Sequence, residues 1–319
     1  MKIAFIYYDF SSFVRQDYEI LSRHFDVEKV NYRKPLDVLR IAGSIWRSDV
    51  SFTWFASGHS FLSVLLSKMM GKKSIVIAGG YDVAFAPEIS YGQYTLGWHK
   101  RKYADFALKN TDLVLAVSEF TKAEVIARAK PKKIKVIYNA IDIYKFRPAN
   151  RKEEVTREDL VLTVASGLKN VIKLKGLDIF VEAAAHLPEA KFLVLGLSND
   201  DKEALEGMQS SNNVEFRGYI NQDELILCYQ KAKIYCQLSY RESFGVALAE
   251  AMACGCVPVV TDRGALPEVV GDVGFYVPYG DLESTVFAIK NALKTNNGNR
   301  AGARIEERFS QRMRESRLL

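Results

Sequence analysis

Short runs of apolar, β-favouring residues alternate with segments of helical periodicity along most of this 319-residue chain. KIAFIYY at 2–8 is typical of a buried strand, and the segment 14–25 that follows carries apolar residues at helical spacing. Strands that are apolar throughout must be covered on both faces, and helices usually connect neighbouring parallel strands. The alternation therefore predicts an α/β protein built from doubly wound parallel sheets.

The alternation falls into two blocks, separated by the charged segment FRPANRKEEVTRED at 146–159, which lacks apolar periodicity. We predict a first domain over 1–148, a linker over 149–159, a second domain over 160–298, and a helix over 299–319 that packs back toward the first domain. The predicted strands of the first block are 2–8, 49–55, 73–80, 112–118 and 133–142. Those of the second block are 160–166, 190–196, 214–220, 233–239, 256–262 and 273–278.

The two halves of the chain differ in charge. Residues 1–150 contain 23 Lys and Arg against 14 Asp and Glu, whereas the remainder contains 21 against 24. A basic first half favours an anionic partner, such as a nucleotide, a phosphorylated acceptor or the surface of an acidic membrane. The alternative is a solvated basic face without a partner.

The chain begins with a predicted strand rather than a secretion signal, and three lysines interrupt its most apolar stretch, 61–80. We therefore expect a cytoplasmic protein, either soluble or peripheral at the inner face of the membrane through its basic first domain. Cys254 and Cys256 have no second pair at zinc-like spacing, so we expect buried reduced thiols and no metal site. No nucleic-acid partner is expected.

The segment ESFGVALAE at 242–250 follows a predicted strand and opens a predicted helix over 244–255. Ligands bind at the carboxyl ends of parallel strands, and the first amides of a helix attract anions. With Ser243 as the cap, the backbone N–H groups of 244–246 are candidates to bind a diphosphate. Glu250 would then accept from both hydroxyls of a ribose, while Glu242 faces the other end of the ligand. The alternative is that both carboxylates only stabilise the helix dipole.

The same residues carry a resemblance to a known family. ESFGVALAE with the AMACGCVPVV that follows resembles the Glu-x7-Glu signature of the group 1 retaining glycosyltransferases. Further segments resemble this family in the same order, namely 137–148, 174–188, 216–220 and 264–281. The likeness covers nearly all of 112–310 and is weaker over the first hundred residues. It implies the GT-B fold, with two Rossmann-like domains facing a central cleft.

The resemblance implies a role for each matching residue. Glu242 and Lys175 are the catalytic pair, with Glu242 against the donor sugar and Lys175 against the diphosphate, while Glu250 holds the ribose. Backbone groups at Phe244, Gly245 and Val246 contact sugar and phosphate, and Tyr219 and Ile220 lie near the base. Lys175 also has an interpretation from chemistry alone, because a fixed cation stabilises the charge that builds on a leaving diphosphate. The alternative for Lys175 is a surface lysine in a lysine-rich loop.

The sequence departs from the family pattern in both halves. Asn170 stands where the family has an arginine, and Lys169 or Lys173 is the expected substitute, although a lysine lacks the two-pronged grip of a guanidinium. The turn after the third strand reads AGGYD, which places Gly80 near the donor sugar without the family's histidine. In the first loop, Ser12 and Arg15 are the candidate acceptor contacts. The stretch WHKRKY at 98–103 is a further candidate for the acceptor or for membrane headgroups, and the alternative is a solvated helix face.

No Asp-x-Asp motif occurs in the chain, so we expect transfer without a metal or any other cofactor. The predicted reaction is retaining transfer of a hexose from a nucleotide sugar to a hydroxyl of a glycan, polysaccharide or lipid-linked acceptor. A same-face displacement, in which the leaving phosphate takes the acceptor's proton, fits the lack of an evident nucleophile. Two alternatives stay open: a GT-B-shaped sugar-nucleotide epimerase, and a two-domain ligand-binding protein without catalysis.

Overall fold

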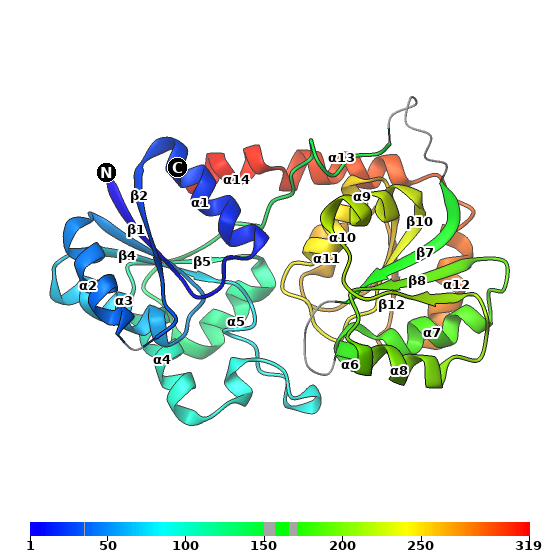
Figure 1. The fold of residues 1–319 in the computed structure, drawn as a ribbon, viewed down its shortest axis with the longest axis horizontal. Helices are drawn as coiled ribbons and strands as arrows, with labels where there is room; N and C mark the ends of the chain where they lie inside the picture. The colour runs from blue at the N-terminus through cyan, green and yellow to red at the C-terminus, as the bar shows by residue number, and fades with distance from the viewer. Residues whose placement is uncertain (35, 150–156, 166–170) are drawn as a thin grey trace. The chain divides into compact units, whose positions relative to one another are not determined.

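The computed structural model describes residues 1–34, 36–149, 157–165 and 171–319. They form two compact units, Met1–Asn139 with Arg314–Leu319, and Ala140–Met313. Each unit holds a six-stranded sheet whose neighbouring strands all pair in parallel, with helices on both faces (Figure 1). The α/β class and the doubly wound parallel sheets are therefore confirmed.

The first unit has the strand order β2-β1-β3-β4-β5-β6. Its strands are β1 (Lys2–Tyr7), β2 (Asp26–Asn31), β3 (Val50–Trp54), β4 (Lys73–Ala78), β5 (Leu113–Ala116) and β6 (Ile134–Val136). Its helices are α1 (Ser12–His24), α2 (Asp37–Arg47), α3 (Gly58–Met69), α4 (Trp98–Asn110) and α5 (Glu119–Ala129), with short 3-10 turns at Pro87–Ile89 and Gln93–Thr95.

Alternating residues of β1 divide the core of this unit into two layers. Ile3 and Phe5 pack with α1 and with Leu318 near the carboxyl terminus. Ala4 and Ile6 pack on the opposite face, against α2 and α3. Because α4 and α5 extend this second layer, the strands are apolar on both sides, as continuous hydrophobic runs require.

The second unit has the strand order β12-β11-β10-β7-β8-β9. Its strands are β7 (Glu158–Val164), β8 (Lys191–Leu195), β9 (Val214–Phe216), β10 (Ala232–Gln237), β11 (Val257–Thr261) and β12 (Phe275–Val277). Its helices are α6 (Val171–Lys175), α7 (Leu177–Ala185), α8 (Asn199–Met208), α9 (Gln222–Lys231), α10 (Val246–Ala253), α11 (Leu266–Val270), α12 (Leu282–Ala292) and α13 (Gly298–Phe309); α14 (Gln311–Leu318) ends the chain. A core cluster joins α7, α8 and α12 to one face of the sheet, whereas α9 and α10 contact β10.

Several boundaries differ from those predicted. The strand predicted over 133–142 ends at Val136, and further along the chain the Ile141 N–H donates to the carbonyl of Phe309 in α13. The predicted linker, 149–159, lies mostly outside the described residues, and β7 already begins at Glu158. The tail from 299 forms two helices that meet at Ser310. No helix in the described parts of the chain is both long enough and apolar enough to cross a membrane.

Candidate functional site

Lys175 and Glu242 meet in the second unit, where Nζ of the lysine lies 2.7 Å from Oε2 of the glutamate. Both side chains are mostly buried, with 16 % and 18 % of their surfaces exposed. Lys175 ends α6, which follows β7, and Glu242 lies in the loop between β10 and α10. Because β7 and β10 are neighbours in the sheet, their carboxyl ends bring the two residues together.

Two further contacts hold the Glu242 carboxylate. Its Oε2 accepts from Nε2 of Gln237 at 3.1 Å, and its Oε1 accepts from the N–H of Ser243 at 3.1 Å. Burial acts to raise the pKa of Glu242, but the Lys175 ammonium and the hydrogen bonds outweigh it and hold the pKa below its usual value. Glu242 is therefore an ionised, fixed carboxylate.

The start of α10 differs from the predicted one. Ser243 does not cap the helix; its hydroxyl accepts from Nη1 of Arg241 at 3.0 Å. Gly245 is the N-cap residue, with φ of 88°, a left-handed backbone that favours glycine. A glycine has no side chain to accept from the first amides of α10, and helix geometry leaves these amides without intrahelical acceptors. The helical amides of α10 therefore begin at Val246, two residues later than the helix start predicted at Phe244.

The side chain of Phe244 belongs to the core rather than to a ligand site. It is 2 % exposed, and its ring packs edge-on against Phe309 of α13, with centroids 5.5 Å apart. Any contact of Phe244 with a ligand must therefore come from its backbone, as the prediction for residues 244–246 requires.

The loop after β11 closes tightly on the backbone of Glu242. The N–H of Ala265 donates to the Glu242 carbonyl at 2.9 Å. A Cβ at Gly264, whose φ is 62°, would lie only 2.2 Å from that carbonyl oxygen. Only glycine fits this approach, so Gly264 helps to set the position of Glu242.

Glu250 lies on α10 with a separate set of partners. Its Oε2 accepts from the hydroxyl of Tyr229, a fully buried residue of α9, at 3.3 Å. Burial raises the pKa of Glu250 to about 7, against the opposing effects of Tyr229 and Lys145. Glu242 and Glu250 are thus not a coupled pair: one is fixed as a carboxylate, and the other titrates near neutrality.

Tyr219 and Ile220 lie in the loop after β9, at the same sheet edge as Lys175 and Glu242 but at the far end of the strand order. Tyr219 is 91 % exposed. Ile220 lines an open pocket of about 590 Å³ that runs along β7, β8, β9 and α9.

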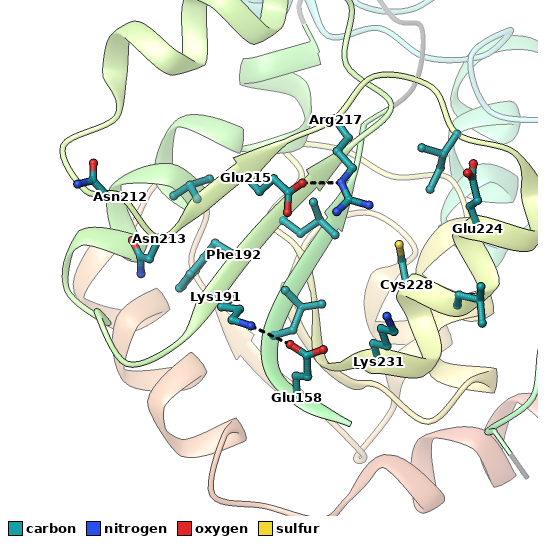
Figure 2. A pocket seen from close by; sticks show the side chains of 15 residues that line it. Glu158, Lys191, Phe192, Asn212, Asn213, Glu215, Arg217, Glu224, Cys228 and Lys231 are labelled. Atoms are coloured by element: carbon teal, nitrogen blue, oxygen red, sulfur yellow. Dashed lines mark hydrogen bonds and ion pairs between the residues drawn. The ribbon is translucent and has the colours of Figure 1, made fainter. Parts of the chain in front are cut away.

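Figure 2 shows this pocket to be lined by both signs of charge. Glu215 pairs with Arg217 at 2.6 Å, and Glu158 pairs with Lys191 at 3.0 Å. The lining includes neither Lys175 nor Glu242 nor any residue of α10. Since this pocket contains neither predicted catalytic residue and no part of the start of α10, we place the candidate donor site at the Lys175–Glu242 pair.

The predicted site residues of the first unit lie at the carboxyl edge of its own sheet. Ser12 and Arg15 are exposed on the first turn of α1, and the Arg15 guanidinium lies 5.5 Å from the ring centre of Phe10. Gly80 is buried after β4, and its N–H donates to Oδ1 of Asp82 at 2.7 Å. Lys169 lies outside the described residues.

His59 and the cysteines lie in surroundings typical of residues that support the fold. The ring nitrogens of His59 lie 2.6 Å from the carbonyl oxygen of Trp54 and 2.8 Å from the hydroxyl of Ser57, and burial lowers its pKa to about 4. All four cysteines are free, and only Cys228 is not fully buried. Across the described ranges, no three His, Cys, Asp or Glu side chains gather as metal ligands would.

Sequence reasoning missed two groups that position the carboxylates. Gln237, 2 % exposed, contacts Glu242 and also donates to the hydroxyl of Ser239 at 2.8 Å. Tyr229 holds Glu250 in the same way. The signal for Gln237 was available, since it is a polar residue at the end of an apolar strand, where a buried amide needs partners.

Comparison with known proteins assigns the chain to a family. The family model described as Glycosyl transferases group 1 matches residues 146–314, and that of Glycosyltransferase Family 4 matches residues 28–145. The chain is 26 % identical over 277 residues to one component of the phosphatidylinositol N-acetylglucosaminyltransferase of Arabidopsis thaliana, covering 78 % of this chain and 61 % of that protein. It is 27 % identical over 286 residues to N-acetyl-alpha-D-glucosaminyl L-malate synthase of Bacillus anthracis, covering 82 % and 71 %. The chain thus spans less than two thirds of the Arabidopsis relative.

Solved structures share the fold over almost the whole chain. Anabaena Alr3699/HepE, solved in complex with UDP-glucose, matches with a TM-score of 0.78 at 18 % identity, covering 100 % of this chain and 98 % of that one. Sucrose-phosphate synthase from Thermosynechococcus elongatus matches with a TM-score of 0.77 at 15 % identity, covering 99 % and 97 %. These likenesses show that the two units have the GT-B fold. The chain belongs to the group 1 glycosyltransferases.

Proposed function

We propose that this protein is a retaining, metal-independent hexosyltransferase that moves a sugar from a nucleotide-sugar donor to an acceptor hydroxyl. The observation that carries the proposal is the Lys175–Glu242 pair, at the carboxyl edge of the second sheet and next to the start of α10. This arrangement brings together, at one edge of the sheet, a fixed cation from α6, a fixed carboxylate from the loop after β10 and the amide end of α10.

Each group has a chemical task in this proposal. The diphosphate lies against the first amides of α10 and the ammonium of Lys175, which stabilise the charge that grows as the phosphate leaves. Glu242 accepts hydrogen bonds from hydroxyls of the donor sugar, and Glu250 accepts from the ribose. Tyr219 and Ile220 flank the base, Lys169 adds positive charge, and Gly80 is proposed as a further contact of the donor sugar.

The surroundings of Glu242 favour direct transfer over a covalent intermediate. Its carboxylate accepts from three donors, which stabilise its negative charge and weaken it as a nucleophile. We therefore propose displacement on one face of the sugar: the bond from the anomeric carbon to the phosphate oxygen breaks, and the acceptor oxygen bonds to that carbon. The leaving phosphate takes the proton of the acceptor hydroxyl.

For the donor we propose a uridine diphosphate sugar. The Anabaena protein was solved with UDP-glucose, and the names of the two curated relatives specify N-acetylglucosaminyl groups. The acceptor is proposed to be a hydroxyl of a glycan, polysaccharide or lipid-linked molecule, contacted by Ser12 and Arg15. The proposed setting is glycoconjugate or polysaccharide synthesis in the cytoplasm.

The test is a donor panel followed by single substitutions. Thermal shift with UDP, GDP and ADP identifies the base, and turnover of the matching nucleotide sugars identifies the hexose. Lys175→Ala and Glu242→Ala should each lower transfer about a hundredfold or more, whereas Lys191→Ala and Glu215→Ala, which remove paired charges elsewhere in the same unit, should not. Transfer within a few-fold of wild type in both site variants would refute the site. Consumption of donor without any acceptor would favour the epimerase.

A further inference from the structure

The outer face of α2 exposes large apolar side chains to solvent. Leu36, Leu39 and Trp46 are 76 %, 71 % and 70 % exposed. Leu36 precedes the helix with a helical backbone, so spacings of three and seven residues place the three side chains along one stripe. The opposite face of α2 buries Ile41 and Ile45 against β1 and β2. The helix is therefore anchored by one apolar face and presents a second to solvent.

Basic residues border this stripe. Residues 33–47 contain four basic side chains, Arg33, Lys34, Arg40 and Arg47, against one acidic one. Arg40 and Arg47 reach Asp37 and Glu28 at 3.4 and 2.7 Å but stay 64 % and 55 % exposed. Exposed pairs of this kind bind weakly, so the arginines remain available to an anionic surface.

α3 and α4, the next two helices of the same layer, also expose large apolar side chains, with basic residues beside the one on α4. α3 packs against both α2 and α4. At its carboxyl end Met69 is 74 % exposed, and at the start of α4 Trp98 is 74 % exposed. Trp98 is followed by the exposed Lys100, Arg101 and Lys102.

We propose that the outer face of α2 binds the surface of a bilayer that contains anionic phospholipid. An amphipathic helix with Leu and Trp on one face and Arg and Lys beside them is suited to lie in the headgroup region. The exposed stripe spans about 15 Å, enough for shallow insertion but far from a span. A second copy of the chain fits the stripe poorly, because a symmetric contact would bring two basic borders together.

The experiment is vesicle flotation of the full chain, with phosphatidylcholine vesicles with and without phosphatidylserine. The wild-type chain should float with the anionic vesicles and lose binding as salt is raised. Leu39→Gln with Trp46→Gln should weaken binding about tenfold or more. Arg33→Gln with Lys34→Gln should weaken it about fivefold for each charge removed. These substitutions are at exposed positions, and thermal melting verifies the fold.

The matched control is Phe287→Gln, which removes an apolar side chain that is 70 % exposed on α12 of the other unit. It should bind vesicles as the wild type does. Equal flotation of all variants, or no flotation of the wild type, would overturn the proposal. So would a wild-type dimer that Leu39→Gln with Trp46→Gln dissociates, because the stripe would then be a self-association surface. Since flotation needs no turnover, this test is independent of the proposed reaction.

Discussion

Arg314 of α14 and Asp17 of α1 form a buried ion pair, with Nε 2.5 Å from Oδ1 and Nη2 2.7 Å from Oδ2. The arginine and aspartate side chains are 1 % and 0 % exposed. Arg314 also donates to the carbonyl oxygens of Ile137 and Tyr138. The end of the chain is thereby built into the core of the first unit, through a contact between residues 297 positions apart in sequence.

We predict that Arg314→Met destabilises the first unit by about 3–5 kcal/mol, because it leaves a buried carboxylate without a partner. Asp17→Leu combined with Arg314→Met should recover much of this loss, since neither charge then remains buried. Arg312→Met, an exposed neighbour on α14, is the control and should change little. Thermal and urea unfolding measure the three variants. A loss in Arg314→Met no larger than in Arg312→Met would contradict the argument.

The Lys175–Glu242 pair should also contribute to the free energy of unfolding. Lys175→Met leaves the Glu242 carboxylate poorly compensated, and we expect a loss of about 2 kcal/mol at pH 7, less than for fully buried pairs because both groups are partly exposed. The pKa of Glu242 is lowered in the fold, so its ionised form contributes stability above pH 4.5 that is lost as the pH falls further.

The loss of stability caused by Lys175→Met should therefore become smaller as the pH is lowered toward 4, because Glu242 of the variant is then protonated. Adding Glu242→Gln should restore most of the stability at pH 7 while transfer stays absent. Melting temperatures of the three proteins at both pH values test this. A loss independent of pH would show that Lys175 acts by packing rather than by charge.

Glu250 has the opposite effect on how stability depends on pH. Its pKa is raised from 4.5 to about 7, so the folded protein holds a proton that the unfolded chain has released between these values. This carboxyl therefore lowers stability progressively as the pH rises from 4.5 to 7. Glu250→Gln removes the titration and should gain stability relative to wild type above pH 7, but little at pH 4.5.

The same proton should affect donor binding if Glu250 accepts from a ribose as a carboxylate. Wild-type affinity for UDP should then rise with pH through about 7, and Glu250→Gln should bind weakly with this dependence lost. Tyr229→Phe removes the hydrogen bond to Glu250 and serves as the positioning control. Calorimetric titrations from pH 5.5 to 8.5 supply the measurement. A pH dependence unchanged in Glu250→Gln would assign the proton to another group.

Central strands could be predicted from sequence because they are buried on both faces, as KIAFIYY shows. β2 was missed for the converse reason. It is an edge strand, DVEKVN, with only Val30 fully buried, so it has no continuous apolar run. α2 was missed with it, although its two apolar faces follow from the pattern at 36–46.

The residues of the candidate site could be predicted from the sequence, but their arrangement in space could not. Glu242 and Lys175 are 67 positions apart, and they meet because β10 inserts beside β7, an order that hydrophobic periodicity does not encode. The Ser243 cap was wrong because a favourable cap residue competes with the backbone turn at Gly245. Tyr229 reaches Glu250 from another helix, 21 positions away in sequence, a contact that no local motif specifies.

Gly264 offers a test of how strictly Glu242 is positioned. In Gly264→Ala the new Cβ would lie 2.2 Å from the carbonyl oxygen and 2.8 Å from the nitrogen of Glu242, so the loop must move. We expect a stability loss of about 2–3 kcal/mol and a decrease in kcat of about ten- to hundredfold, because small displacements of a catalytic group are costly.

Gly207→Ala is the matched control, because Gly207 lies in α8 with nothing within 4 Å of its would-be Cβ. There the same substitution should stabilise the helix by up to about 1 kcal/mol and leave transfer unchanged. Melting temperature and kcat, measured together for both variants, separate strain at Glu242 from a general effect of glycine replacement. Full activity in Gly264→Ala would mean that the loop after β11 does not position the carboxylate.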